Sequence, residues 1–98
     1  MYKNVDFNGN YFLIPNKVFN EKLKPREFIV YCYLKRCTDQ RYQCFPSRKT
    51  IAENCCISVP TVDAALKELE AKCLITITHR YDSSNGNMLS HLYTVEKI

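Results

Sequence analysis

The sequence predicts an α+β domain in which three or four helices are followed by a C-terminal β-hairpin. Two patterns support this prediction: apolar residues recur at helical spacing as far as Leu69, and after Cys73 they alternate with a period of two. Residues 82–87 interrupt the alternation with the sequence Asp-Ser-Ser-Asn-Gly-Asn, in which Asn-Gly is a strong hairpin signal. The chain has 98 residues, so we expect one domain with one modest core.

The first 24 residues are expected to form an arm and a short helix ahead of the main domain. Residues 11–14 have the composition of a short strand or an extended arm. Residues 16–23 have helical spacing, with Asn16 as a candidate N-cap. This part of the chain is also a candidate dimerisation surface. The aromatic residues that suggest this include Tyr2, Phe7, Tyr11, Phe12, Phe19, Tyr31 and Tyr33, all ahead of the two central helices.

A longer helix is expected from Pro25 to about Cys37. Its interior, residues 28–34, is apolar on nearly all sides and would also suit a buried strand. Pro25 in the first turn, Glu27 close behind it and the basic pair at residues 35–36 favour a helix, because these residues match the polarity of a helix at its two ends.

Two further helices are predicted on either side of a tight turn. After a short strand at residues 43–45, Ser47 is placed to cap a helix that runs through about Glu53. Ser58 caps the next helix, whose apolar face consists of Val62, Ala65, Leu66 and Leu69. A helix, a tight turn and a second helix followed by a hairpin make up a winged helix-turn-helix domain, which we expect over residues 25–98.

Several short motifs support a resemblance to known proteins across roughly residues 25–96. They are Phe45-Pro46-Ser47, Thr50-Ile51-Ala52, Ile57-Ser58, Thr61-Val62, Ala65-Leu66, Leu69, Leu74-Ile75 and Tyr93-Thr94-Val95. The sequence resembles the winged helix-turn-helix domains of plasmid and phage replication or transfer proteins in low-GC Gram-positive bacteria. The resemblance implies double-stranded DNA as the partner, other plasmid-processing proteins as further partners, and a role at a plasmid origin or in transcription regulation.

Candidate DNA contacts lie in the two central helices and in the hairpin. They are Arg48, Lys49, Thr61, Lys67, Arg80, Tyr81, Ser83, Ser84, Asn85, Asn87 and His91. Arginine and asparagine suit base edges, whereas serine hydroxyls and basic groups at a helix N-terminus suit phosphates. Two alternatives stay open: the polar hairpin residues are ordinary solvated turn residues, and His91 is a partly buried histidine beside Tyr93.

Two features depart from the pattern of such domains. The helix that begins after Ser58 holds the acids Asp63, Glu68 and Glu70 against two lysines, and an acidic helix is a weak anchor for a groove lined with phosphates. We therefore expect the hairpin, with Arg80 as its main base contact, to provide most of the affinity. The acidic helix also leaves a protein-docking module as the rival function. The second departure is Cys73, which stands where a glycine is common after this helix.

Charge and composition are compatible with a nucleic-acid partner without requiring one. The net charge is +4, and it is unevenly distributed: residues 1–50 hold ten basic and four acidic side chains, whereas residues 51–98 hold four basic and six acidic ones. The chain shows no targeting segment at its start, and its longest apolar run is far shorter than the roughly 20 residues of a membrane span. We expect a cytoplasmic protein.

The six cysteines are expected to be reduced and mostly part of the core. No Cys-x-x-Cys pair is present, so neither a metal site nor any other cofactor is predicted. An enzyme is not expected, because the two glycines form no phosphate loop and the two histidines have no nucleophile at motif spacing. A single reactive thiolate is the remaining catalytic alternative.

Overall fold

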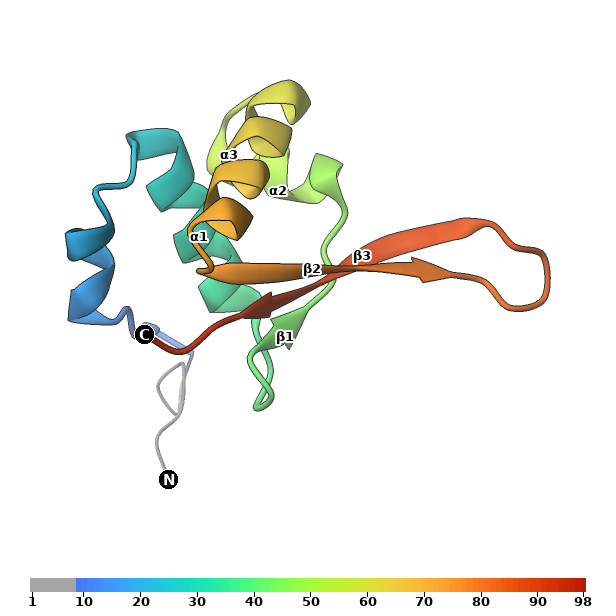
Figure 1. Ribbon diagram of the computed structural model, residues 1–98, viewed down its shortest axis with the longest axis horizontal. Helices are drawn as coiled ribbons and strands as arrows, with labels where there is room; N and C mark the ends of the chain where they lie inside the picture. Colours follow the sequence, from blue (N-terminus) through green and yellow to red (C-terminus); the bar gives the residue numbers. More distant parts are fainter. Residues whose placement is uncertain (1–8) are drawn as a thin grey trace.

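The computed structural model describes residues 9–98 and confirms the predicted α+β architecture, with helices packed above a small antiparallel sheet (Figure 1). The elements in order are the 3-10 helix η1 (Asn16–Glu21), α1 (Pro25–Cys37), β1 (Gln43–Cys44), α2 (Arg48–Cys55), α3 (Val59–Ala71), β2 (Ile75–Tyr81) and β3 (Met88–Val95). Two of the aromatic residues considered for dimerisation, Tyr2 and Phe7, lie outside the described residues.

The helix α1 has the predicted bounds and excludes the strand alternative for residues 28–34. Pro25 occupies its first turn, and the Glu27 carboxylate accepts a hydrogen bond from the backbone N–H of Lys24 at 3.0 Å. This bond satisfies a donor that the helix itself leaves open. The side of α1 formed by Val30, Tyr31 and Leu34 is fully buried and packs against α2 and α3.

Both serine caps of the central helices are confirmed. The Ser47 hydroxyl accepts from the backbone N–H of Thr50 at 3.0 Å, and the Ser58 hydroxyl accepts from that of Thr61 at 3.3 Å. The helix α2 runs two residues further than expected, to Cys55, and ends where Cys56 takes a left-handed conformation with φ of 58°. The predicted apolar face of α3 is buried in full.

Cys73 has a clear conformational role at the end of α3. Its φ is 61°, in the left-handed region that favours glycine, which explains why a glycine is common at this point. The N–H of Leu74 reaches back to the carbonyl of Leu69 at 3.0 Å, so the turn closes normally and leads directly into β2. The cysteine therefore takes the conformation that ends α3 in place of a glycine.

The segment before α1 differs from its prediction. Residues 16–23 do not form an α-helix capped by Asn16: a 3-10 helix begins after Pro15, without a side-chain cap, and ends at Lys22 in a left-handed conformation. The 3-10 helix stops at Glu21 because Lys22 takes a left-handed conformation with φ of 55°, which no helix continues. The segment nevertheless contributes to the core, since Val18 is fully buried.

The sheet has the strand order β1-β3-β2, and its hairpin extends well beyond the rest of the molecule (Figure 1). The strand β1 pairs only with Tyr93 and Thr94 of β3, so the outer part of the hairpin is a two-stranded ribbon. The register is regular from Ile75 to Thr78 and then shifts by a bulge before Arg80. A projecting ribbon next to a helix-turn-helix is the predicted wing.

Candidate nucleic-acid interface

Three elements meet at a concave surface between the helices and the hairpin. It is lined by residues from the first turn of α2, from α3 and from the hairpin, and two adjoining grooves of about 360 and 310 Å³ follow it. The basic, acidic and histidine side chains of this concave surface are Arg48, Lys49, Asp63, Lys67, Glu70, His79 and His91. Four of the eleven candidate contacts, Arg48, Lys49, Lys67 and His91, are thus brought together here.

The strand alternation determines which hairpin residues reach this surface. Ile75 is buried against the helices, so His79 and Tyr81 lie on the same face of β2, here called the inner face. The ring of His91 lies 4.2 Å from that of His79, which places it on the inner face as well. His91 is half-buried, and its pKa is lowered by desolvation, by His79 and by Arg48. His91 is therefore both partly buried and part of the concave surface.

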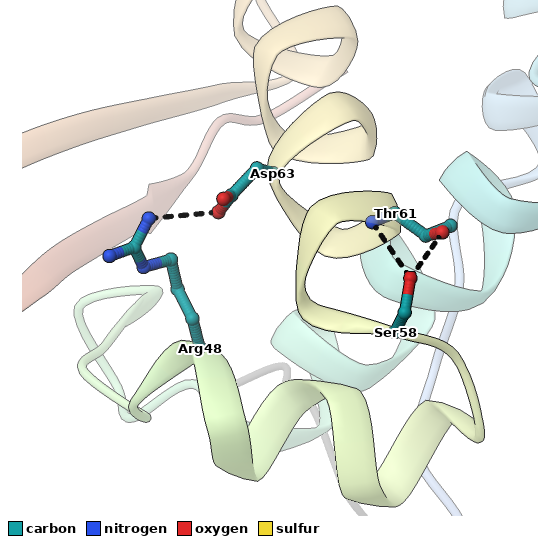
Figure 2. A network of polar contacts seen from close by, with 4 residues as sticks. All are labelled: Arg48, Ser58, Thr61 and Asp63. Carbon is teal, nitrogen blue, oxygen red and sulfur yellow. Dashed lines mark hydrogen bonds and ion pairs between the residues drawn. The ribbon is translucent and has the colours of Figure 1, made fainter.

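An ion pair joins the two central helices across this surface. The Arg48 guanidinium at the start of α2 lies 3.0 Å from the Asp63 carboxylate on α3 (Figure 2). The second acid, Glu70, accepts a hydrogen bond from the backbone N–H of Ile77 at 3.1 Å. Both carboxylates that line the concave surface are thus bonded within the protein. The charge of Asp63 is thus compensated by Arg48, whereas Glu70 keeps its negative charge on this side of α3.

Two lysines supply the positive charge that remains. Lys49 on α2 and Lys67 on α3 are exposed, and neither ammonium group has a bonded partner among residues 9–98. Thr61 is different, because it is half-buried and its hydroxyl lies 2.8 Å from that of Ser58 (Figure 2). Thr61 therefore takes part in the cap of α3 through both its backbone N–H and its hydroxyl.

Arg80 lies apart from the other candidates. Its position next to His79 in β2 places it on the opposite, outer face of the hairpin. There its Nε donates to the carbonyl of Ser90 at 2.8 Å, and its guanidinium lies 4.8 Å from the centre of the Phe45 ring. Ser90 and Phe45 thus hold the Arg80 guanidinium on the outer face, although Ser90 and Leu89, the register partner of Arg80, also line the larger groove.

The hairpin loop is organised by its own side chains. The Asp82 carboxylate accepts from the Ser84 backbone N–H at 2.8 Å and from the Ser84 hydroxyl at 2.6 Å, and these bonds lower the pKa of Asp82. The Asn85 side-chain oxygen accepts from the N–H of Asn87 at 2.8 Å. Ser84 and Asn85 are thus engaged in turns, as the alternative reading allowed. The exposed side chains of Ser83 and Asn87 have no bonded partner among the described residues.

Sequence reasoning missed two features of this surface. His79 was not singled out as a contact, although its period-two spacing from Ile75 and Ile77 places it on the inner face. The Arg48–Asp63 pair left no signal, because its members are 15 residues apart and meet only through the angle between α2 and α3. Among residues 9–98, no three His, Cys, Asp or Glu side chains form a group that could hold a metal ion, and no helix is long and apolar enough to cross a membrane.

The fold and this surface together define a winged helix-turn-helix domain, in which α2 and α3 form the helix-turn-helix and β2 and β3 the wing. Comparison with protein families gives a match to a helix-turn-helix domain family over residues 21–75, more than half of the chain, and the protein belongs to this family. Membership supports DNA as its partner. A search of curated proteins found no match.

Proposed function

We propose that the protein binds double-stranded DNA sequence-specifically through the concave surface, with α3 and the inner face of the hairpin on either side of the contact. The observation that supports this proposal is the charge pattern. Arg48 compensates the charge of Asp63, so Lys49 and Lys67 leave an excess of positive charge over the one remaining carboxylate, that of Glu70, beside two histidines. Positive groups in that arrangement attract the phosphate backbone, and the exposed positions of α3 are then placed to meet base edges.

The biological setting follows from the resemblance found in the sequence. We propose a role at a plasmid origin of replication or transfer, or as a transcriptional regulator, with other plasmid-processing proteins as further partners. The small size and the content of cysteine and lysine also resemble a conjugation accessory protein of a clostridial plasmid. Such roles place the protein in the cytoplasm with its DNA.

A binding role also agrees with the state of the cysteines. Burial raises the pKa of the Cys44 thiol to about 12, and burial likewise raises the pKa of Cys32 and Cys55. A thiol with a raised pKa is a poor nucleophile near neutral pH, because the thiolate is the reactive form. These three residues therefore give no support to catalysis, and we propose a protein that binds rather than an enzyme.

The rival function, docking to another protein, rested on the acids of α3. Asp63 is paired with Arg48, so Glu68 and Glu70 are the acids of α3 whose charge is not compensated by an ion pair among residues 9–98. Two carboxylates on a helix that also exposes Lys67 give little electrostatic complementarity to a basic partner. DNA binding is thus better supported than docking.

We further propose that the protein acts as a homodimer, because one small domain reads few base pairs and two-fold pairing onto two half-sites extends the contact. Phe19 of η1 and Ile29 of α1 are exposed to 66% and 42%, on elements that lie on the side of the molecule away from the wing (Figure 1). Sedimentation that shows only monomers at micromolar concentration would remove this part of the proposal.

The salt dependence of binding tests the main proposal. Fluorescence anisotropy with duplexes recovered by selection from a random pool should show a dissociation constant that rises steeply between roughly 50 and 200 mM salt, because each phosphate contact releases a counterion. A dissociation constant that is insensitive to salt, or the absence of any selected duplex, would favour a protein partner instead.

A further inference from the structure

The outer part of the wing exposes an apolar pair that the charge pattern does not explain. Tyr81 and Met88 are register partners across β2 and β3, and their exposed fractions are 58% and 60%. Large apolar side chains exposed at the same point of a narrow ribbon lose stabilising burial unless a partner covers them. We therefore expect a binding partner to cover Tyr81 and Met88.

The pair is continuous with the concave surface. Tyr81 follows His79 on the inner face of β2, and Met88 lines the larger groove together with Arg48 and Lys49. A molecule held by the cations of this groove therefore extends toward Tyr81 and Met88. A partner that contacts both the cations and this apolar pair must carry negative charge as well as apolar surface. Duplex DNA has both, in its phosphates and its stacked bases.

The shape of the wing suits entry into a groove. Beyond the two residues that pair with β1, the hairpin is a ribbon of two strands that projects from the body of the protein (Figure 1). Its loop is a poor contact for phosphates, because Asp82 is kept ionised by its bonds to Ser84, which lower its pKa. The inner side of the ribbon, rather than its loop, is thus the part that can approach the duplex closely.

We propose that Tyr81 and Met88 form an apolar wedge that enters between two base pairs of the bound duplex and bends it. This inference rests on the proposed function and adds that the site reads the deformability of DNA as well as its bases. Apolar side chains inserted at a base step partly unstack it and kink the helix, at a cost that is lowest for flexible pyrimidine–purine steps. The preferred sites should therefore contain such a step where the wing lies.

The test measures base unstacking, DNA bending and protein binding on the same duplex. A duplex recovered by selection carries 2-aminopurine at a central TA step and a donor–acceptor dye pair at its ends. With the unchanged protein, 2-aminopurine fluorescence should rise and the end-to-end distance should shorten. The double variant Tyr81→Ala/Met88→Ala should bind more weakly, and at protein concentrations that saturate the duplex both signals should stay at the level of the free duplex. Neither residue is buried, and circular dichroism checks that the variant is folded.

Phe45→Ala is the matched control, because Phe45 is an aromatic residue of similar exposure, 59%, that contacts Arg80 on the outer face. It should leave unstacking and bending intact. Binding by the unchanged protein without either signal, or equal bending by the double variant, overturns the wedge while leaving DNA binding in place. If the double variant instead loses self-association and the duplex stays straight, the pair covers a second copy of the chain and the inference is wrong. If the unchanged protein binds no duplex, the proposed function itself fails.

Discussion

The guanidinium of Arg48 lies 3.0 Å from the carboxylate of Asp63, so the first turn of α2 and the exposed side of α3 are joined by an ion pair. The side chains are 53% and 36% exposed, and solvent screening limits such a pair to about 0–1 kcal/mol of stability. Its main effect is electrostatic: it cancels a negative charge on the helix expected to face the phosphates.

Removal of the negative charge of Asp63 should strengthen DNA binding. Asp63→Asn keeps the size of the side chain and frees the Arg48 guanidinium for phosphate, so we expect affinity to rise several-fold with little change in stability. Arg48→Ala leaves Asp63 unpaired and should weaken binding more than Lys49→Ala does. Anisotropy titrations at fixed salt measure all three, and a weaker Asp63→Asn complex would show that the pair acts by positioning Arg48.

Arg80 is the residue on which sequence and structure give different expectations. If Arg80 contacts a base, the variant Arg80→Ala should bind DNA roughly ten- to a hundredfold more weakly. Its hydrogen bond to Ser90 and its contact with the Phe45 ring predict instead a smaller loss of DNA affinity than Lys67→Ala causes, together with a less stable hairpin. Parallel titrations and thermal unfolding separate the two outcomes, and a tenfold loss of affinity with unchanged stability would restore the base-contact role.

The fold was predictable because its signals are local. Pro25, Ser47 and Ser58 mark helix starts, and the spacing of Val62 to Leu69 marks the buried side of α3. The site was less predictable, since it depends on how elements pack. The pairing of Arg48 with Asp63 requires the angle between two helices, whereas the separation of Arg80 from His79 was already implied by strand alternation.

The pH dependence of binding follows from His91. Its pKa is lowered by burial, His79 and Arg48, so the free protein holds it neutral near pH 7, whereas nearby phosphates favour the charged form. DNA affinity should therefore rise as the pH falls from about 8 to about 5.5, with proton uptake on binding. His91→Asn should flatten this profile, and an unchanged profile would place the proton uptake elsewhere.

The stability of the free protein should respond to pH in the opposite sense. A histidine whose folded pKa lies below its unfolded pKa contributes stability above the unfolded value, and loses that contribution as the pH falls toward the folded value. Urea unfolding below about pH 6.5 should thus show a small loss of stability that His91→Asn lacks. A gain of stability on acidification in this range would contradict the lowered pKa.

The two serine caps should each contribute to the stability of the fold. Ser58→Ala and Ser47→Ala each remove an acceptor for a helix N–H and should lower the free energy of unfolding by about 0.5–2 kcal/mol. Ser83→Ala in the hairpin loop, where the side chain has no bonded partner among the described residues, is the matched control and should cost almost nothing. Equal losses for all three variants would mean that the caps add nothing specific.

The central claim, that the concave surface is the DNA-binding surface, is tested most directly by two charge-matched variants. Lys67→Ala removes an exposed cation from α3 on this surface, and Lys17→Ala removes an exposed cation from η1, on the far side of the molecule (Figure 1). Affinity for a selected duplex, measured over a series of salt concentrations, should fall for Lys67→Ala, with the slope of log K against log salt reduced by about 0.9. Lys17→Ala should retain the affinity and slope of the unchanged protein. Equal effects of the two variants, or a larger effect of Lys17→Ala, would place the DNA on another face.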